Sequence, residues 1–228
     1  MTNRQFSFLI FVLFLLLAAL TLTLIGVLTE YWYYVEADSN LNETMQQHWN
    51  YNYGLWKKCY TDIPRDIVKN KVGSCVTIYQ DLIKRDESSL DKDGQVYMHL
   101  SRSVVGFAIA MGAVQLAAVF TLICGNWPGN CKTIRKGKLY LSASLILLFA
   151  TMCGIVSGIS FIALRDLDRK DRGMYPYGVS SQYGWSFMVT WISAGLNIVD
   201  SFILLCLLRT VYDDVNEGKK YYYYNMGN

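Results

Sequence analysis

The chain has 228 residues, of which 53% are hydrophobic and 17% charged, with a formal net charge of +3 at pH 7. This small positive balance does not favour a nucleic-acid-binding protein. The apolar residues are gathered into four long runs instead of being spread along the chain as in a soluble domain. Each run is long enough for a helix that crosses a bilayer, which needs about 20 residues. The composition therefore predicts an integral membrane protein.

The first apolar run, Phe6–Leu28, is the first predicted span. Arg4 precedes it and the run contains Ala18 and Ala19, a combination also found in secretory signal peptides. The run is longer than the roughly 7–15 apolar residues of a signal peptide. We therefore expect a retained helix, with a cleaved leader as the alternative.

A long polar segment, residues 29–102, follows the first span. Aromatic and β-branched residues predict three short strands in it, at 31–35, 51–56 and 76–79. Turn-forming residues lie between Cys59 and Cys75, and two strands that bracket a turn can bring their cysteines within bridging distance. A disulfide here would stabilise a small folded unit by about 3 kcal/mol. Two free thiols are the alternative.

Other residues of this segment have less specific interpretations. Trp32 lies close to the first span, where tryptophans often occupy the membrane–water interface, whereas Trp56 is far enough along the chain that we expect it to pack beneath a sheet. Asn42 begins an Asn-Glu-Thr sequon for N-glycosylation. His48 and His99 are isolated, without the spacing of metal ligands.

The second predicted span is Ser103–Cys124, and the loop after it predicts the orientation of the chain. Residues 125–138 contain four basic residues and no acidic one, which places this loop in the cytoplasm by the positive-inside rule. Both termini, including the tail from about 209 to 228, are then cytoplasmic. Residues 29–102 and 165–185 become extracellular.

The cysteines outside the first loop divide by location. Cys124 and Cys131 flank the cytoplasmic loop and are candidates for S-palmitoylation, with free reduced thiols as the alternative. Cys153 and Cys206 lie inside the predicted spans.

The third and fourth predicted spans are Leu139–Leu164 and Ser186–Leu208. Gly154 and Gly158 in the third span form a small-xxx-small pattern that lets helices approach closely. We expect them to pack within the bundle, with docking of a partner helix as the alternative.

The fourth span contains the one acidic residue well inside a membrane segment. Asp200 follows Asn197 by one helical turn, and a carboxylate at the bilayer centre costs about 2.5–3.5 kcal/mol unless it is solvated or paired. Gln115, near the middle of the second span, is the expected hydrogen-bond partner. A role in binding an ion or a partner protein is the alternative.

A set of residues in the first loop forms a recognisable signature: Trp32, Gly54-Leu55-Trp56, Cys59, Cys75 and Arg102. It resembles the signature of the tetraspan superfamily of claudins, peripheral myelin proteins and calcium-channel gamma subunits, and the chain looks most like a divergent claudin. The resemblance covers all of residues 1–228 as a single domain. It implies a membrane α-helical fold, a left-handed bundle of four transmembrane helices with a small extracellular antiparallel β-sheet.

The resemblance also implies a function. A claudin-like protein would lie in the plasma membrane at lateral cell–cell junctions, contact like molecules in the same and adjacent membranes together with other junction proteins, and contribute to the paracellular barrier. The segment Tyr183–Phe187 resembles the gamma branch, which makes an auxiliary subunit of an ion channel or receptor the alternative. No catalytic set, cofactor or metal site is expected.

Overall fold

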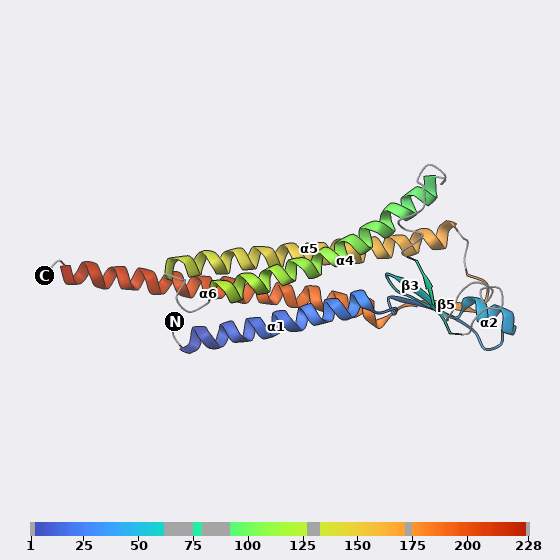
Figure 1. Cartoon of the computed structure of the whole chain (residues 1–228), viewed down its shortest axis with the longest axis horizontal. Coiled ribbons are helices and arrows are strands. Elements are labelled where there is room, and N and C mark those ends of the chain that lie inside the picture. The colour runs from blue at the N-terminus through green and yellow to red at the C-terminus, as the bar shows by residue number, and fades with distance from the viewer. Residues whose placement is uncertain (1–2, 62–74, 79–91, 127–132, 172–174, 227–228) are drawn as a thin grey trace. The chain divides into compact units, whose positions relative to one another are not determined.

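The structure, a computed structural model, describes residues 3–61, 75–78, 92–126, 133–171 and 175–226. It contains four long helices, labelled in Figure 1: α1 (Asn3–Leu28), α4 (Lys92–Gly125), α5 (Thr133–Asp171) and α6 (Trp185–Met226). Each includes a stretch that is long and apolar enough to cross a membrane, namely Gln5–Leu28, Gly94–Gly125, Gly137–Arg169 and Trp185–Asp213. The chain is therefore a multi-pass membrane protein, as predicted.

All four helices are longer than the predicted spans. Helix α4 begins at Lys92 instead of Ser103, and α6 continues to Met226. An apolar run in the sequence marks only the part of a helix that can lie in the bilayer. The helix itself can continue beyond it until a residue such as proline interrupts the backbone hydrogen bonds. Among the described residues there is one proline, Pro176, and it lies outside the helices.

A five-stranded antiparallel sheet accompanies the helices. Its strands are β1 (Tyr33–Ala37), β2 (Tyr51–Tyr53), β3 (Lys57–Tyr60), β4 (Cys75–Thr77) and β5 (Val179–Tyr183), in the order β4-β3-β2-β1-β5. Strands β1, β2 and β4 confirm the three strands predicted in the first loop, whereas β3 was not among them. Strand β5 comes from the second loop and was not predicted, and neither was the short helix α2 (Glu43–Trp49).

The described chain divides into two compact units. The helical unit comprises residues 1–21, 110–153 and 193–228, and the sheet unit comprises residues 22–109 and 154–192. Residues from all four helices form the core of the helical unit, among them the fully buried Leu16, Leu122, Leu147 and Leu204. The treatment of the chain as one domain and the left-handedness of the bundle stay predictions.

The core of the sheet unit is mainly aromatic. Trp32, Tyr33 and Tyr51 from the strands and their flanks pack with Phe161 of α5 and Phe187 of α6. The ring centroids of Phe187 and Tyr183 are 5.0 Å apart in a stacked arrangement. Large rings bury much apolar area per residue, so a small unit gains a core from few side chains.

Candidate functional site

Both tryptophans of the first-loop signature bind the last turn of α1. The indole N–H of Trp32 donates to the carbonyl oxygen of Gly26, and that of Trp56 donates to the carbonyl oxygen of Val27 over 2.8 Å. The last four carbonyls of a helix have no partner within the helix, and an indole is a donor without acceptor capacity, so the two groups complement each other. The signature tryptophans thus cap the carboxyl end of α1.

Among the described residues, Trp32 is also the largest fully buried side chain, with 0% of its surface exposed. Its ring lies edge-on to Phe161, with centroids 5.0 Å apart, and 5.7 Å from Phe187. The interpretation of Trp32 as a membrane-interface residue is therefore wrong, because nothing of the indole remains to contact lipid headgroups. Trp56 is partly buried and packs against the same core, in line with the expectation of packing beneath the sheet.

Gly54 allows the signature segment to cross the chain that leaves α1. A Cβ atom at position 54 would lie 2.6 Å from the Cα of Glu30 and 2.9 Å from the carbonyl oxygen of Thr29. Both are backbone atoms, which cannot rotate away. The Gly54 N–H donates to the Lys57 carbonyl over 2.9 Å, and Leu55 is buried. Each residue of the Gly-Leu-Trp triplet therefore has its own role. Gly54 permits the close backbone crossing, Leu55 packs in the core, and Trp56 caps the end of α1.

Gly184 likewise allows a close backbone approach, just before the start of α6. A Cβ atom there would collide with the carbonyl group of Tyr31, while the Gly184 N–H donates to the Trp32 carbonyl over 2.8 Å. The segment Tyr183–Phe187 thus contacts the signature directly.

The predicted disulfide is confirmed. Cys59 of β3 and Cys75 of β4 are register partners in the antiparallel pair, and their sulfur atoms are bonded. The bond ties the edge strand β4, which has only three residues, to the rest of the sheet. A covalent link of this kind stabilises a small unit chiefly by restricting its unfolded chain.

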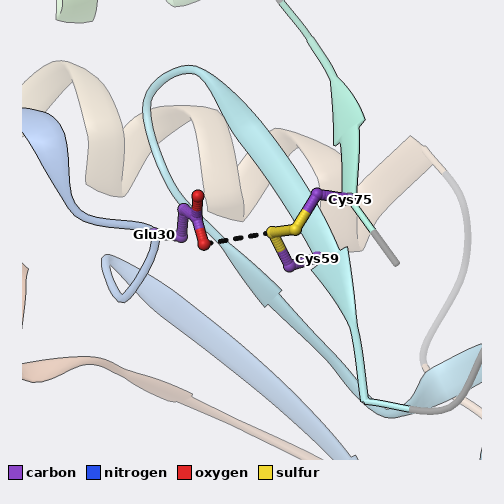
Figure 2. A group of neighbouring side chains, drawn as sticks. All are labelled: Glu30, Cys59 and Cys75. Carbon is purple, nitrogen blue, oxygen red and sulfur yellow. Dashed lines mark hydrogen bonds between the residues drawn. A yellow bond between two sulfur atoms is a disulfide. The ribbon is translucent and has the colours of Figure 1, made fainter. Parts of the chain in front are cut away.

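A carboxylate lies beside the disulfide (Figure 2). Oε2 of Glu30 is 3.1 Å from Sγ of Cys59, and Oε1 is 3.8 Å from Nζ of Lys57. The sulfur carries no proton once it is in a disulfide, so it donates no hydrogen bond to this oxygen. A cysteine binds a metal ion as its thiolate, so Cys59 and Cys75 do not offer metal ligands of this kind while the disulfide is intact.

We expect Glu30 to slow reduction of this disulfide. Reduction proceeds by attack of a thiolate on one sulfur while the other leaves as a thiolate. Cys59 is buried and Cys75 is more exposed, so attack on Cys75 makes Cys59 the leaving sulfur, next to a like charge. Glu30→Gln should therefore raise the rate of reduction by a small thiol about tenfold, which corresponds to about 1.4 kcal/mol. This is a fraction of the roughly 4 kcal/mol between unit charges 4 Å apart near a surface.

The rate is measured on the full-length protein in detergent by trapping freed cysteines with an alkylating reagent. Glu36→Gln, a change of an exposed glutamate on β1, is the matched control and should leave the rate unchanged. Equal rates for Glu30→Gln and the wild type would contradict the electrostatic explanation.

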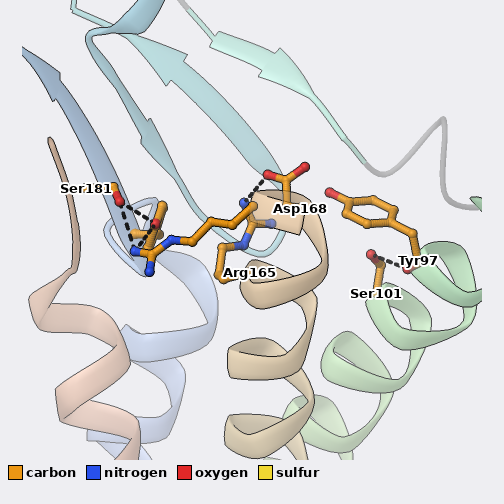
Figure 3. A network of polar contacts seen from close by, with 7 residues as sticks. Tyr97, Ser101, Arg165, Asp168 and Ser181 are labelled. Atoms are coloured by element: carbon orange, nitrogen blue, oxygen red, sulfur yellow. Dashed lines mark hydrogen bonds and ion pairs between the residues drawn. The ribbon is translucent and has the colours of Figure 1, made fainter. Parts of the chain in front are cut away.

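A buried arginine joins the end of α5 to the sheet (Figure 3). Arg165 is almost completely buried, and its Nη1 lies 3.5 Å from Oδ2 of Asp168. The guanidinium carbon lies 4.1 Å from the ring centroid of Tyr53 and 5.5 Å from that of Tyr33. A cation between aromatic rings is stabilised by their faces, and more so where water is excluded.

Arg169, one turn later, extends this connection. Its Nη2 donates to the Tyr33 hydroxyl over 3.1 Å and to Oγ of Ser181 over 3.0 Å, and the Tyr33 hydroxyl also donates to Ser181 over 2.7 Å. These bonds link α5, β1 and β5. Neither arginine was predicted as a functional residue, because residues 165–185 were treated only as an extracellular loop with mixed charges.

The phenols around this cluster stay neutral at physiological pH. Burial raises the pKa of Tyr51, and burial is also the main reason why the pKa of Tyr175 rises to about 12. The charge of Arg165 is therefore balanced by Asp168 and by ring faces, and not by phenolates of Tyr51 or Tyr175.

The remaining predicted sites of the loops and the tail are outside this cluster. Asn42 is exposed at the start of α2, and His48 and His99 are exposed. Arg102 is a half-buried residue of α4. Cys124 is exposed, whereas Cys131 lies outside the described residues. Glycosylation of Asn42 and acylation of Cys124 and Cys131 stay predictions.

The polar residues of the spans are buried in the helical unit. Nε2 of Gln115 donates to Oδ1 of Asn197 over 3.0 Å and to Oγ of Ser193 over 3.1 Å, and Ser193 donates to the Ala19 carbonyl over 2.8 Å. The expectation that Gln115 bonds Asp200 is wrong, because its amide meets α6 one turn earlier, at Asn197. Both carboxylate oxygens of Asp200 are buried without a hydrogen bond to a described protein atom.

The side chain of Tyr177, in the sheet unit, is fully exposed. Residues Pro176–Val179 form a turn in which the Val179 N–H donates to the Pro176 carbonyl over 3.0 Å. Gly178 has φ +88°, a conformation that favours glycine, and a Cβ there would press on Leu41. The turn holds Tyr177 fully exposed immediately before β5.

A family model described as PMP-22/EMP/MP20/Claudin tight junction matches residues 17–206. The matched range includes both signature tryptophans, the disulfide and all five strands.

Proposed function

Because the chain belongs to the PMP-22/EMP/MP20/claudin family, matched over residues 17–206, we propose that it is a claudin-like component of cell–cell junctions. Residues 29–102 and 165–185 face the extracellular space and both termini are cytoplasmic. The sheet unit contacts like molecules in the same and the facing membrane and contributes to the paracellular barrier. No chemical reaction is part of this role.

The observation that carries this proposal is Tyr177. Aromatic residues are the commonest anchors of protein interfaces, because they bury a large area and lose little conformational entropy. Tyr177 is fully exposed on a turn whose geometry is restricted by Gly178 and by pairing of β5 with β1. An exposed aromatic side chain on a conformationally restricted turn at the rim of an extracellular sheet suits contact with a partner surface.

The sheet offers a second mode of contact. Strands β4 and β5 are its two edges in the described chain, and edge strands can pair with strands of a neighbouring molecule. Contacts through the edges would align molecules side by side within one membrane, and Tyr177 would serve contacts between membranes.

The test is a barrier assay in epithelial cells. Loss of the protein should raise leakage of a tracer between cells, and re-expression of the wild type should restore the barrier. We expect Tyr177→Ala to reach the cell surface in normal amount and to fail in this rescue. Tyr212→Ala, which removes another exposed tyrosine on α6, is the control and should rescue fully. Full rescue by Tyr177→Ala would contradict the assigned role of this side chain.

A second candidate function is that of an auxiliary subunit of an ion channel or receptor. Tyr31 and Trp185 are both exposed and stack with ring centroids 5.7 Å apart at the start of α6. Such an aromatic pair suits packing against the helix of a partner. Stoichiometric co-purification with a channel, combined with unchanged tracer leakage after loss of the protein, would favour this function over the junction role.

A further inference from the structure

The described part of the chain buries one carboxylate completely, and it lies in a predicted membrane span. Asp200 has 0% of its surface exposed. It shares one face of α6 with the buried Ser193, Asn197 and Ser201. Positions 193, 197 and 201 follow at intervals of four residues and position 200 follows 197 by three, and residues three or four apart share a helix face. An ionisable group in such a place has a role that packing alone does not explain.

The groups around this face are polar but uncharged. Gln115 of α4 bonds Asn197, and Oγ of Ser201 lies 2.7 Å from Oγ of Ser144 on α5. The ionisable residues of the helical unit that are described as buried, Tyr140 and Cys153, are neutral in their ordinary forms. The basic side chains described for this unit, Lys138 and Arg209, are exposed. No buried cation among these residues is available to balance an ionised Asp200.

Around this face, the buried acceptors without a partner outnumber the buried donors without one. Three acceptor oxygens are buried without a protein donor: Oδ1 and Oδ2 of Asp200 and Oε1 of Gln115. One donor, Nδ2 of Asn197, is buried without an acceptor. A bridging water molecule does not remove this surplus of acceptors, because it brings as many acceptor sites as donors.

We propose that Asp200 binds one proton in the folded protein and is the centre of a buried proton-binding cluster with Asn197 and Gln115. Protonation removes the uncompensated charge, whose burial is costly. It also converts one unpaired acceptor into a donor, so that the unpaired buried groups become two donors and two acceptors instead of one donor and three acceptors. The cluster is independent of the junction role proposed above.

The proton is coupled to packing of the helices. In a denatured form in which water reaches α6, Asp200 behaves as an ordinary aspartic acid, which is ionised at neutral pH. The folded form therefore holds a proton that the water-exposed denatured form releases, and by linkage the stability of the folded protein falls as the pH rises.

The direct test is infrared spectroscopy of the full-length protein in lipid nanodiscs at neutral pH. The wild type should give the carbonyl stretch of a protonated carboxylic acid, and Asp200→Asn should lack it. Asp213→Asn, which removes an exposed acid of the same helix, is the matched control and should retain the band. Asp200→Glu should keep an acid band at a shifted position, which provides the answer if Asp200→Asn does not fold.

Three results would overturn the proposal. The first is the absence of the acid band from the folded wild type, and the second is its persistence in Asp200→Asn. The third is a melting temperature that depends on sodium or potassium in the wild type but not in Asp200→Asn, because a metal cation would then occupy the place assigned to the proton. Thermal melting from mildly acidic to alkaline buffer supplies an independent readout, in which the wild type should lose stability and Asp200→Asn should not.

Discussion

Trp32→Ala is expected to destabilise the protein by about 3–5 kcal/mol, the range for removal of a large aromatic side chain from a core. Trp32 is fully buried against Phe161 and Phe187, and its indole N–H satisfies the Gly26 carbonyl at the end of α1. The substitution therefore leaves a cavity and an unpaired carbonyl together. Thermal melting of the detergent-purified protein measures the loss, and delivery to the cell surface should fall with it.

Two further variants separate these contributions. Trp32→Phe fills part of the volume but removes the N–H, so it should cost about 1–3 kcal/mol, the penalty for a buried carbonyl left without a donor. Trp185→Ala is the control, because Trp185 is half exposed and should matter little to stability. If Trp32→Ala melts at the same temperature as the wild type, Trp32 does not stabilise the contact between the strands and the last turn of α1.

Gly54→Ala is expected to destabilise the protein by about 1–3 kcal/mol, the usual cost of forcing extra atoms into a packed region. The added methyl group would meet backbone atoms of Glu30 and Thr29 at 2.6–2.9 Å, and no side-chain rotation relieves such a contact. We expect a lower melting temperature and less protein at the surface.

A matched glycine on α4 gives the opposite expectation. A Cβ at Gly106 would meet nothing within 4 Å, and alanine favours a helix interior over glycine by about 1 kcal/mol. Gly106→Ala should therefore melt at or slightly above the wild-type temperature. Equal destabilisation by the two substitutions would show that the close crossing at Gly54 is not what makes glycine necessary there.

The sequence predicted features that depend on local pattern. The disulfide between Cys59 and Cys75 follows from two short strands around a turn, and the four spans follow from apolar length. Strand β5 escaped prediction because Val-Ser-Ser-Gln-Tyr carries a weak strand signal and becomes a strand by pairing with β1, which is remote in the sequence.

The roles of individual polar groups were less predictable. Trp32 is near a span in the sequence, and only the folded chain shows that its N–H reaches a helix carbonyl instead of a lipid headgroup. Helical spacing places Asn197 and Asp200 on one face of α6 but does not tell which of them opposes Gln115. Arg165 was predicted at the start of an extracellular loop, where a charge is normally exposed, whereas aromatic rings of the sheet unit cover it in the structure.

The central claim is that an anchored, disulfide-linked sheet unit presents Tyr177 to like molecules in a facing membrane. Its most direct test is the distribution of the fluorescently tagged full-length protein in cells that form no junctions of their own. We predict enrichment at contacts between two expressing cells, no enrichment at contacts with non-expressing cells, and loss of enrichment for Tyr177→Ala at equal surface expression. A uniform distribution of the wild type over the surface, contacts between expressing cells included, would contradict the account.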